Sequence, residues 1–176
     1  IPLTMISRQY QVPQLTEQRQ TDTIAHQVVL EHSMRAVWFD CFSGISGDMT
    51  LGALLHAGGD EGNLRETLSR LSISGWDLQI SSTNQNGIGA IDVTVAMTPE
   101  QGHGRHLHHI EEILTSSDIP QSIRDRAFSV FNRLAAAEAK VHQTTVDKIH
   151  FHEVGAVDAI VDIVGSCILM DEMGID

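Results

Sequence analysis

Residues 76–97 have the sequence Trp-Asp-Leu-Gln-Ile-Ser-Ser-Thr-Asn-Gln-Asn-Gly-Ile-Gly-Ala-Ile-Asp-Val-Thr-Val-Ala-Met, and this stretch decides the fold class. Apolar and polar residues alternate over residues 76–82 and again over residues 88–97, which is the period of a strand with one buried face. Asn86-Gly87 lies between the two runs, and Asn-Gly suits a type I′ hairpin turn because both positions adopt positive φ. The stretch therefore predicts an antiparallel β-hairpin.

Segments with helical periodicity lie on both sides of this hairpin. Leu64, Leu68 and Leu71 recur at the i, i+4, i+7 spacing of one helix face. The full pattern predicts strands at residues 35–40 and 148–151 and helices at residues 49–56, 61–71, 106–114, 120–142 and 154–173. We therefore expect an α/β (mixed α+β) fold, with a small sheet, a strand–loop–helix start, the hairpin and several packed helices.

The last two helices each have an apolar stripe that predicts how they pack. Asp118 is the expected N-cap of the first of them, with Pro120 in its first turn. The residues expected to be buried are Ile123, Ala127, Val130, Phe131, Leu134 and Val141 in the first helix, and Val154, Val157, Val161, Val164 and Ile168 in the second.

Composition narrows the class of protein. The 176 residues suffice for one domain, and 23 acidic against 11 basic residues give a net charge of −12. We expect no nucleic-acid partner, because binding to phosphates needs basic stripes. Cys41 and Cys167 are far apart, which predicts neither a disulfide framework nor a zinc ribbon and fits a reducing cytoplasm. No apolar run reaches the ~18 residues of a membrane span, so we expect no membrane association.

The first 33 residues differ from the remainder. They are rich in Gln and Thr, have little apolar periodicity and lack the apolar block of a secretory signal. We expect residues 1–33 to be a poorly ordered extension and residues 34–176 to form the folded domain, with Met34 as its natural start. We also expect more of the protein to follow Gly174-Ile175-Asp176.

A first group of histidines is His103, His106, His108 and His109. Imidazole nitrogen suits nickel, zinc and copper. His106 and His109 share a face if the helix begins there, because they are three residues apart. The pattern is typical of transient metal capture, and the alternative is a solvated polar loop and first helical turn.

A second group is His150-Phe151-His152-Glu153. In an extended segment residues i and i+2 point the same way, so both imidazoles face one side while Phe151 anchors in the core. Glu153 is a candidate third ligand, a residue that orients the ligands, or a proton acceptor. The alternative is a strand edge with two solvated histidines.

Carboxylates follow in the next helix and flank an earlier glycine loop. Asp158 and Asp162 are like charges four residues apart, which destabilise a helix unless a cation, a buried basic partner or a magnesium-bound phosphate offsets them. The alternative is a helix face turned to water. Asp40 and Asp48 bracket a loop at a position where α/β proteins often place active-site groups. The loop residues Ser43, Gly44, Ser46 and Gly47 precede a helix whose free N–H groups suit an anion. Cys41 in this loop is a possible thiolate ligand or a small buried residue.

Three motifs together resemble one protein family. They are Asp40-Cys-Phe-Ser-Gly-Ile-Ser-Gly-Asp-Met49, Leu134-Ala-Ala-Ala-Glu-Ala-Lys-Val-His142 and His150-Phe-His-Glu-Val-Gly-Ala-Val-Asp-Ala-Ile-Val-Asp-Ile-Val-Gly165. In this order they resemble the nickel-insertion family LarC, over its N-terminal part. The resemblance implies a nickel chelatase of the lyase class that inserts Ni(II) into pyridinium-3,5-bisthiocarboxylic acid mononucleotide. The product is the nickel-pincer cofactor, and the recipient is an apo lactate racemase-type enzyme.

The same resemblance implies CTP with Mn(II) or Mg(II), bound by a C-terminal half that this chain lacks, and a homo-oligomer. This chain also departs from the family in its sparse histidine loop and its 33-residue extension. We expect His106, His108 and His109 to capture nickel and His150, His152 and Glu153 to hold it near the substrate. Asp40, Asp48, Asp158 and Asp162 would serve a second cation or orient ligands, with Glu153, Asp40 and Asp48 as the catalytic candidates. The alternatives are a non-catalytic nickel metallochaperone or store, and a divalent-metal-dependent hydrolase.

Overall fold

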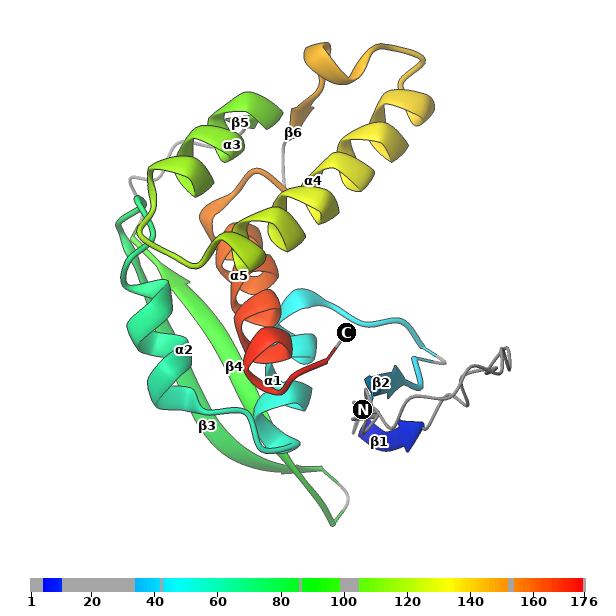
Figure 1. Cartoon of the computed structure of the whole chain (residues 1–176), viewed down its shortest axis with the longest axis vertical. Helices are drawn as coiled ribbons and strands as arrows, with labels where there is room; N and C mark the ends of the chain where they lie inside the picture. Colours follow the sequence, from blue (N-terminus) through cyan, green and yellow to red (C-terminus); the bar gives the residue numbers. More distant parts are fainter. Residues whose placement is uncertain are drawn as a thin grey trace, which may run out of the picture.

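The computed structural model describes residues 5–10, 34–41, 43–85, 87–98, 105–151 and 154–175. Figure 1 shows helices packed beside one long hairpin, which confirms the mixed α/β class. The elements in chain order are β1 (Met5–Tyr10), β2 (Met34–Phe39), α1 (Gly47–His56), α2 (Glu61–Leu68), β3 (Trp76–Gln85), β4 (Ile88–Met97), β5 (Arg105–His106), α3 (Leu107–Ser116), α4 (Gln121–Val141), the 3-10 helix Val146–Lys148, β6 (His150–Phe151) and α5 (Val157–Glu172).

The strands of the described part pair as three separate two-stranded antiparallel ladders, β1–β2, β3–β4 and β5–β6, rather than as one small sheet. The β3–β4 hairpin confirms the alternation argument, with a register from Trp76 opposite Met97 to Gln85 opposite Ile88. Gly87 in the turn has a φ of 84°, a left-handed conformation that glycine adopts without strain.

Helix α1 lies directly on β4. A Cβ atom at Gly52 would be 2.4 Å from the backbone oxygen of Ile91, so only glycine allows this approach. On its other side α1 packs against α5, where Gly165 meets the side chain of Leu51. The two glycines therefore bring the hairpin, α1 and α5 together as successive layers.

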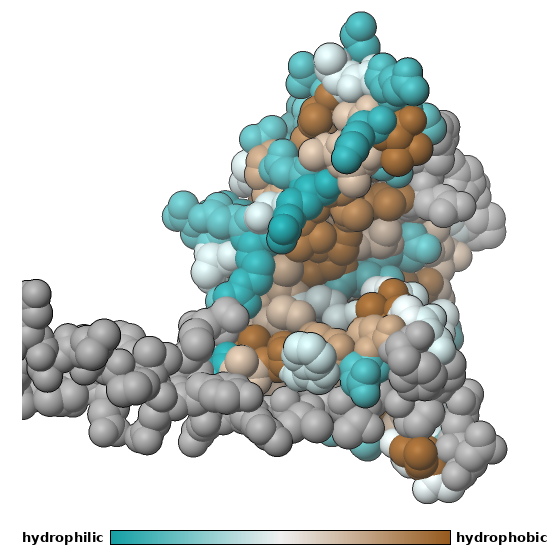
Figure 2. Space-filling model, turned by 90° about the vertical axis from the view of Figure 1, so that its right-hand side faces the viewer, coloured by the Kyte–Doolittle hydropathy of each residue, from teal (hydrophilic) through white to brown (hydrophobic). Residues whose placement is uncertain are grey.

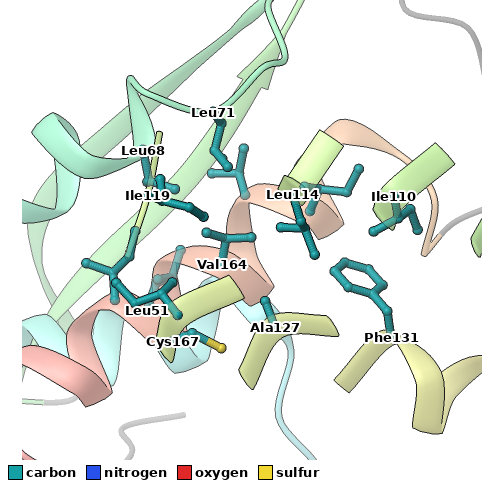
Figure 3. Packing of buried hydrophobic residues seen from close by; sticks show 14 of the residues in the cluster. Leu51, Leu68, Leu71, Ile110, Leu114, Ile119, Ala127, Phe131, Val164 and Cys167 are labelled. Carbon is teal, nitrogen blue, oxygen red and sulfur yellow. The ribbon is translucent and has the colours of Figure 1, made fainter. Parts of the chain in front are cut away.

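Helix α5 is the centre of the core, as Figure 3 shows for Val164 and Cys167 among residues from α1, α2, α3 and α4. The predicted apolar stripe of α5 is confirmed, because Val157, Val161, Val164 and Ile168 are buried and Val154 packs against the same core. Burial also raises the pKa of the Cys167 thiol to about 11, so it stays protonated at neutral pH.

Two predictions for α4 are wrong. Its buried face is Ile123, Ala127, Phe131, Ala135 and Ala139, a strict four-residue repeat. Val130 and Val141 fall off this repeat and are 37% and 77% exposed. Pro120, not Asp118, occupies the N-cap position. An N-cap at Asp118 would require Ile119 to be helical immediately before a proline, which the proline ring disfavours.

The strand β2 is held from two sides. It pairs with β1 from Met5 opposite Phe39 to Tyr10 opposite Met34, so part of the predicted extension adds a strand; the rest of that extension lies outside the described residues. The guanidinium of Arg35 in β2 donates to the backbone oxygen of Met173, which follows α5.

On the face shown in Figure 2, apolar residues gather in a recess below a largely hydrophilic upper end. In the described part, no helix is long and apolar enough to cross a membrane.

Candidate metal site

The short β5–β6 ladder brings described histidines of the two predicted groups together. Its register places His106 opposite His150 and Arg105 opposite Phe151. Directly opposite residues of an antiparallel pair project to the same face, so the histidines share one face and Phe151, which is fully buried, anchors the other. The predicted anchoring role of Phe151 is confirmed, and the described histidines of the two groups form one cluster.

Four imidazole rings make up this histidine cluster: His106 in β5, His108 and His109 in the first turn of α3, and His150 in β6. The ring centres of His106 and His150 are 4.9 Å apart and perpendicular, and those of His106 and His108 are 5.5 Å apart and nearly parallel. His108 and His109 are closest, at 4.0 Å. The cluster is partly open to solvent, since His108, His109 and His150 are exposed and His106 is half-buried.

Hydrogen bonds orient two of these rings. Nδ1 of His106 lies 2.8 Å from the backbone oxygen of Ile149. Nδ1 of His109 accepts a hydrogen bond of 3.1 Å from the backbone N–H of His106, which closes the first turn of α3. The backbone around the cluster is also fixed, because the Arg105 guanidinium donates to the oxygen of Gly155 at 2.6 Å. Sequence patterns did not indicate Arg105 or Ile149 as supports of the site.

The predicted ligands His103, His152 and Glu153 lie outside the described residues. Within the described residues, no three side chains of His, Cys, Asp and Glu are arranged so that they hold a metal ion. The histidine cluster therefore gathers imidazoles on one face, whereas its donor atoms do not converge on a single point in the arrangement seen.

A second group, the carboxylate cluster, consists of Asp48 in α1 and Asp158 and Asp162 in α5. Burial and then the negative charges of Asp48 and Asp158 raise the pKa of Asp162 to about 7. Oδ1 of Asp162 is buried without a hydrogen-bond partner among the described residues. Asp48 accepts from the Ser46 hydroxyl and from its neighbour's backbone N–H. Asp40 is exposed after β2 and is not among the charges that act on Asp162.

The glycine loop before α1 is shaped by Asp162. A Cβ atom at Gly47 would lie 2.5 Å from Cβ and from Oδ2 of Asp162, so glycine is required here for contact with the carboxylate. Gly44 has a φ of 86° and closes a turn onto the oxygen of Cys41, which is half-buried. An anion at this helix start would meet the Asp162 carboxyl at close range. The four loop residues Ser43, Gly44, Ser46 and Gly47 remain a prediction as an anion site.

A group of imidazoles and a group of carboxylates, on a mixed α/β scaffold, define a candidate divalent-metal-handling domain. The family described as nickel insertion protein matches residues 37–176, and the chain belongs to this family. No solved structure matches.

Individual relatives agree with the family. The chain is 44% identical over 143 residues to the pyridinium-3,5-bisthiocarboxylic acid mononucleotide nickel insertion protein of Desulfitobacterium hafniense. The matched region covers 81% of this chain and 35% of the relative. Proteins with the same description from Akkermansia muciniphila and Acetivibrio thermocellus are 42% and 40% identical over 152 and 151 residues, covering 81% of this chain and 37% of each relative. The chain thus spans little more than a third of the length of these relatives.

Proposed function

We propose that this chain is the nickel-holding part of a chelatase that inserts Ni(II) into pyridinium-3,5-bisthiocarboxylic acid mononucleotide, which yields a nickel-pincer cofactor for an apo lactate racemase-type enzyme. The observation that carries the proposal is the histidine cluster, in which residues 44 positions apart are opposite each other in the β5–β6 register. The descriptions of the relatives support the substrate. We further propose that the protein works in the cytoplasm as a homo-oligomer.

The chemistry of the cluster suits delivery of nickel as a substrate. Neutral imidazole binds Ni(II) well, while the softer thiocarboxylate sulfurs of the acceptor compete for the ion. The exposed rings of His108 and His150 offer an entry from solvent, and the half-buried His106 lies between them. Nickel would move from these nitrogens to the substrate, with His103, His152 and Glu153 as the further predicted ligands.

CTP with Mn(II) or Mg(II) does not fit the described residues. The glycine loop, the expected phosphate site, has the Asp162 carboxyl against Gly47, and the Ser46 hydroxyl is already bonded to Asp48. The carboxylate cluster offers the hard oxygens that Mn(II) and Mg(II) prefer, yet its donor atoms do not converge on an ion. We therefore propose that CTP and its metal bind to the C-terminal half of the family.

The proposal is tested by His106→Ala and His150→Ala, singly and together, with His56→Ala as the matched control. His56 is an exposed histidine in the last turn of α1, away from the cluster. We expect nickel binding in equilibrium titration to weaken at least about tenfold in the double variant. Activation of an apo lactate racemase, with the C-terminal half supplied, should fall in parallel, while the control behaves as wild type.

Unchanged nickel binding and activation in the double variant would contradict the proposal. The two alternatives give other results: a nickel store would bind several ions and ignore both CTP and the C-terminal half, and a hydrolase would cleave phosphate or carboxylic esters with Mn(II).

A further inference from the structure

Two adjoining open hollows lie against α3, next to the histidine cluster. The larger hollow has a volume of about 690 Å³ and the smaller one about 430 Å³, and small-molecule sites typically have about 300–1,000 Å³. The larger hollow is lined by Arg105, His109, Glu112, Ile113, Thr115 and Ser116. The smaller hollow is lined by residues 71–74 and shares Arg105 and Ile113 with the larger one. Because His109 also belongs to the histidine cluster, a ligand in the larger hollow would lie beside that cluster.

Arg105 lines both hollows, and part of its guanidinium is unbonded. Its Nη1 donates to the backbone oxygen of Gly155 at 2.6 Å, which holds the half-buried side chain in place. Among the described residues, no group accepts a hydrogen bond from Nε or Nη2 or forms an ion pair with them. These two atoms form the edge by which arginine binds two oxygens of one phosphate. Arg105 therefore offers a fixed cation with spare donors.

A negative charge lines the larger hollow without neutralising this cation. Glu112 is exposed, and no ion pair joins these two described residues, Glu112 and Arg105. The hydroxyls of Thr115 and Ser116 already donate to backbone oxygens of α3, so they offer no proton to an anion. The larger hollow thus has separate groups for an anion and for a cation, and Ile113, which packs against the core, adds an apolar surface.

The substrate in the descriptions of the relatives, a pyridinium mononucleotide, has charges of the same two kinds. Its ring is a cation, and its phosphate is an anion that a ribose separates from the ring. We infer that the larger hollow binds this substrate, with the phosphate on the free edge of Arg105 and the cationic ring facing Glu112. The inference rests on the proposed function and assigns the substrate a place beside the histidine cluster.

Two related ligands separate the phosphate contact from the ring contact. Nicotinic acid mononucleotide has a pyridinium ring and a phosphate, and nicotinic acid riboside lacks only the phosphate. In calorimetric titration of the chain, we expect wild type to bind the mononucleotide at least about tenfold more tightly than the riboside. Arg105→Gln should lose this preference. The control is Arg70→Gln, which changes an exposed arginine paired with Glu66 and should keep the preference.

The ratio of the two affinities distinguishes a binding role from a structural one. If Arg105 only held the backbone of Gly155, its loss would weaken both ligands alike and leave the ratio unchanged. Glu112→Gln should weaken both ligands equally, by about two- to fivefold, because both carry the cationic ring. Its control is Glu111→Gln, since the neighbouring exposed Glu111 lines neither hollow.

Cytidine monophosphate is the competing ligand, because it carries the same phosphate and has no cationic ring. Cytidine monophosphate that binds as tightly as the pyridinium mononucleotide, wild-type chain that binds neither pyridinium ligand, or an unchanged ratio in Arg105→Gln would overturn the inference. The proposed function fails separately. It is refuted if the double variant of His106 and His150 keeps nickel binding and activation, and the affinity ratio in Arg105→Gln still decides whether the larger hollow is a mononucleotide site.

Discussion

Replacement of Asp162 by Asn should make the protein more stable above neutral pH. The pKa of Asp162 rises from 3.8 to about 7 on folding, so the folded state favours the protonated carboxyl. Stability from this group is present below the unfolded pKa and is lost as the pH rises through about 7. The asparagine variant has no proton to lose and avoids this change.

The magnitude follows from the shift. A rise from 3.8 to about 7 corresponds to about 4 kcal/mol at about 1.4 kcal/mol per pH unit. The Asp162 side chain is only partly buried, and solvent screening lowers the expected value to about 1–2 kcal/mol. Between about pH 4.5 and pH 8, the free energy of unfolding of Asp162→Asn should therefore gain about 1–2 kcal/mol relative to wild type.

Urea unfolding followed by circular dichroism at several pH values measures this difference. Asp77→Asn, which changes an exposed aspartate of β3, controls for the loss of one negative charge from the surface. Parallel pH profiles of wild type and Asp162→Asn would refute the reasoning. The same pair of proteins tests the predicted second cation: Mn(II) bound by the carboxylate cluster would stabilise wild type at about pH 8 and leave the variant unchanged.

Three further substitutions test the packing that supports the site. Gly52→Ala places a Cβ atom 2.4 Å from the oxygen of Ile91 and should lower the free energy of unfolding by about 1–3 kcal/mol in urea titration. The control is Gly89→Ala, which should not show this loss because a Cβ atom at Gly89 has nothing within 4 Å. Phe131→Ala opens a cavity at a fully buried position and should cost about 3–5 kcal/mol, and a loss below about 1 kcal/mol would contradict its place in the core. Asp60→Ala removes the N-cap of α2, whose side chain accepts from two backbone N–H groups, and should lower stability by about 0.5–2 kcal/mol.

Much of the fold was predictable because its signals are local. Strand alternation and Asn86-Gly87 specify the β3–β4 hairpin, and the period of α5 specifies its buried face. The errors in α4 arose because the residues buried in this helix are chosen by its contacts with other helices, which the local sequence does not show. Valine is apolar enough for the core, yet Val130 and Val141 lie outside the four-residue repeat by which α4 packs, and small alanines take the inner positions.

The site was harder to predict because its parts meet through pairing of very short strands. A two-residue strand such as β5 or β6 has no detectable period, so the sequence could not show that His106 and His150 are opposite each other. For the same reason the sequence suggested a capture group and a separate inner group. The raised pKa of Asp162 depends on the contact of α5 with Gly47 and Asp48, which no spacing along the chain reveals.

The order of exposed His150 and buried Phe151 in β6 limits how the chain can change in length during evolution. Side chains alternate along a strand, so a shift of β6 by one residue would turn Phe151 outward and His150 toward the core. An insertion or deletion of one residue between α4 and β6 is tolerated only if the turn at Val146–Lys148 absorbs it before the strand begins. We expect relatives to differ in the length of that turn. The number of residues between the end of the turn and the buried aromatic residue should differ only by even numbers, because an odd change would turn the aromatic side chain outward.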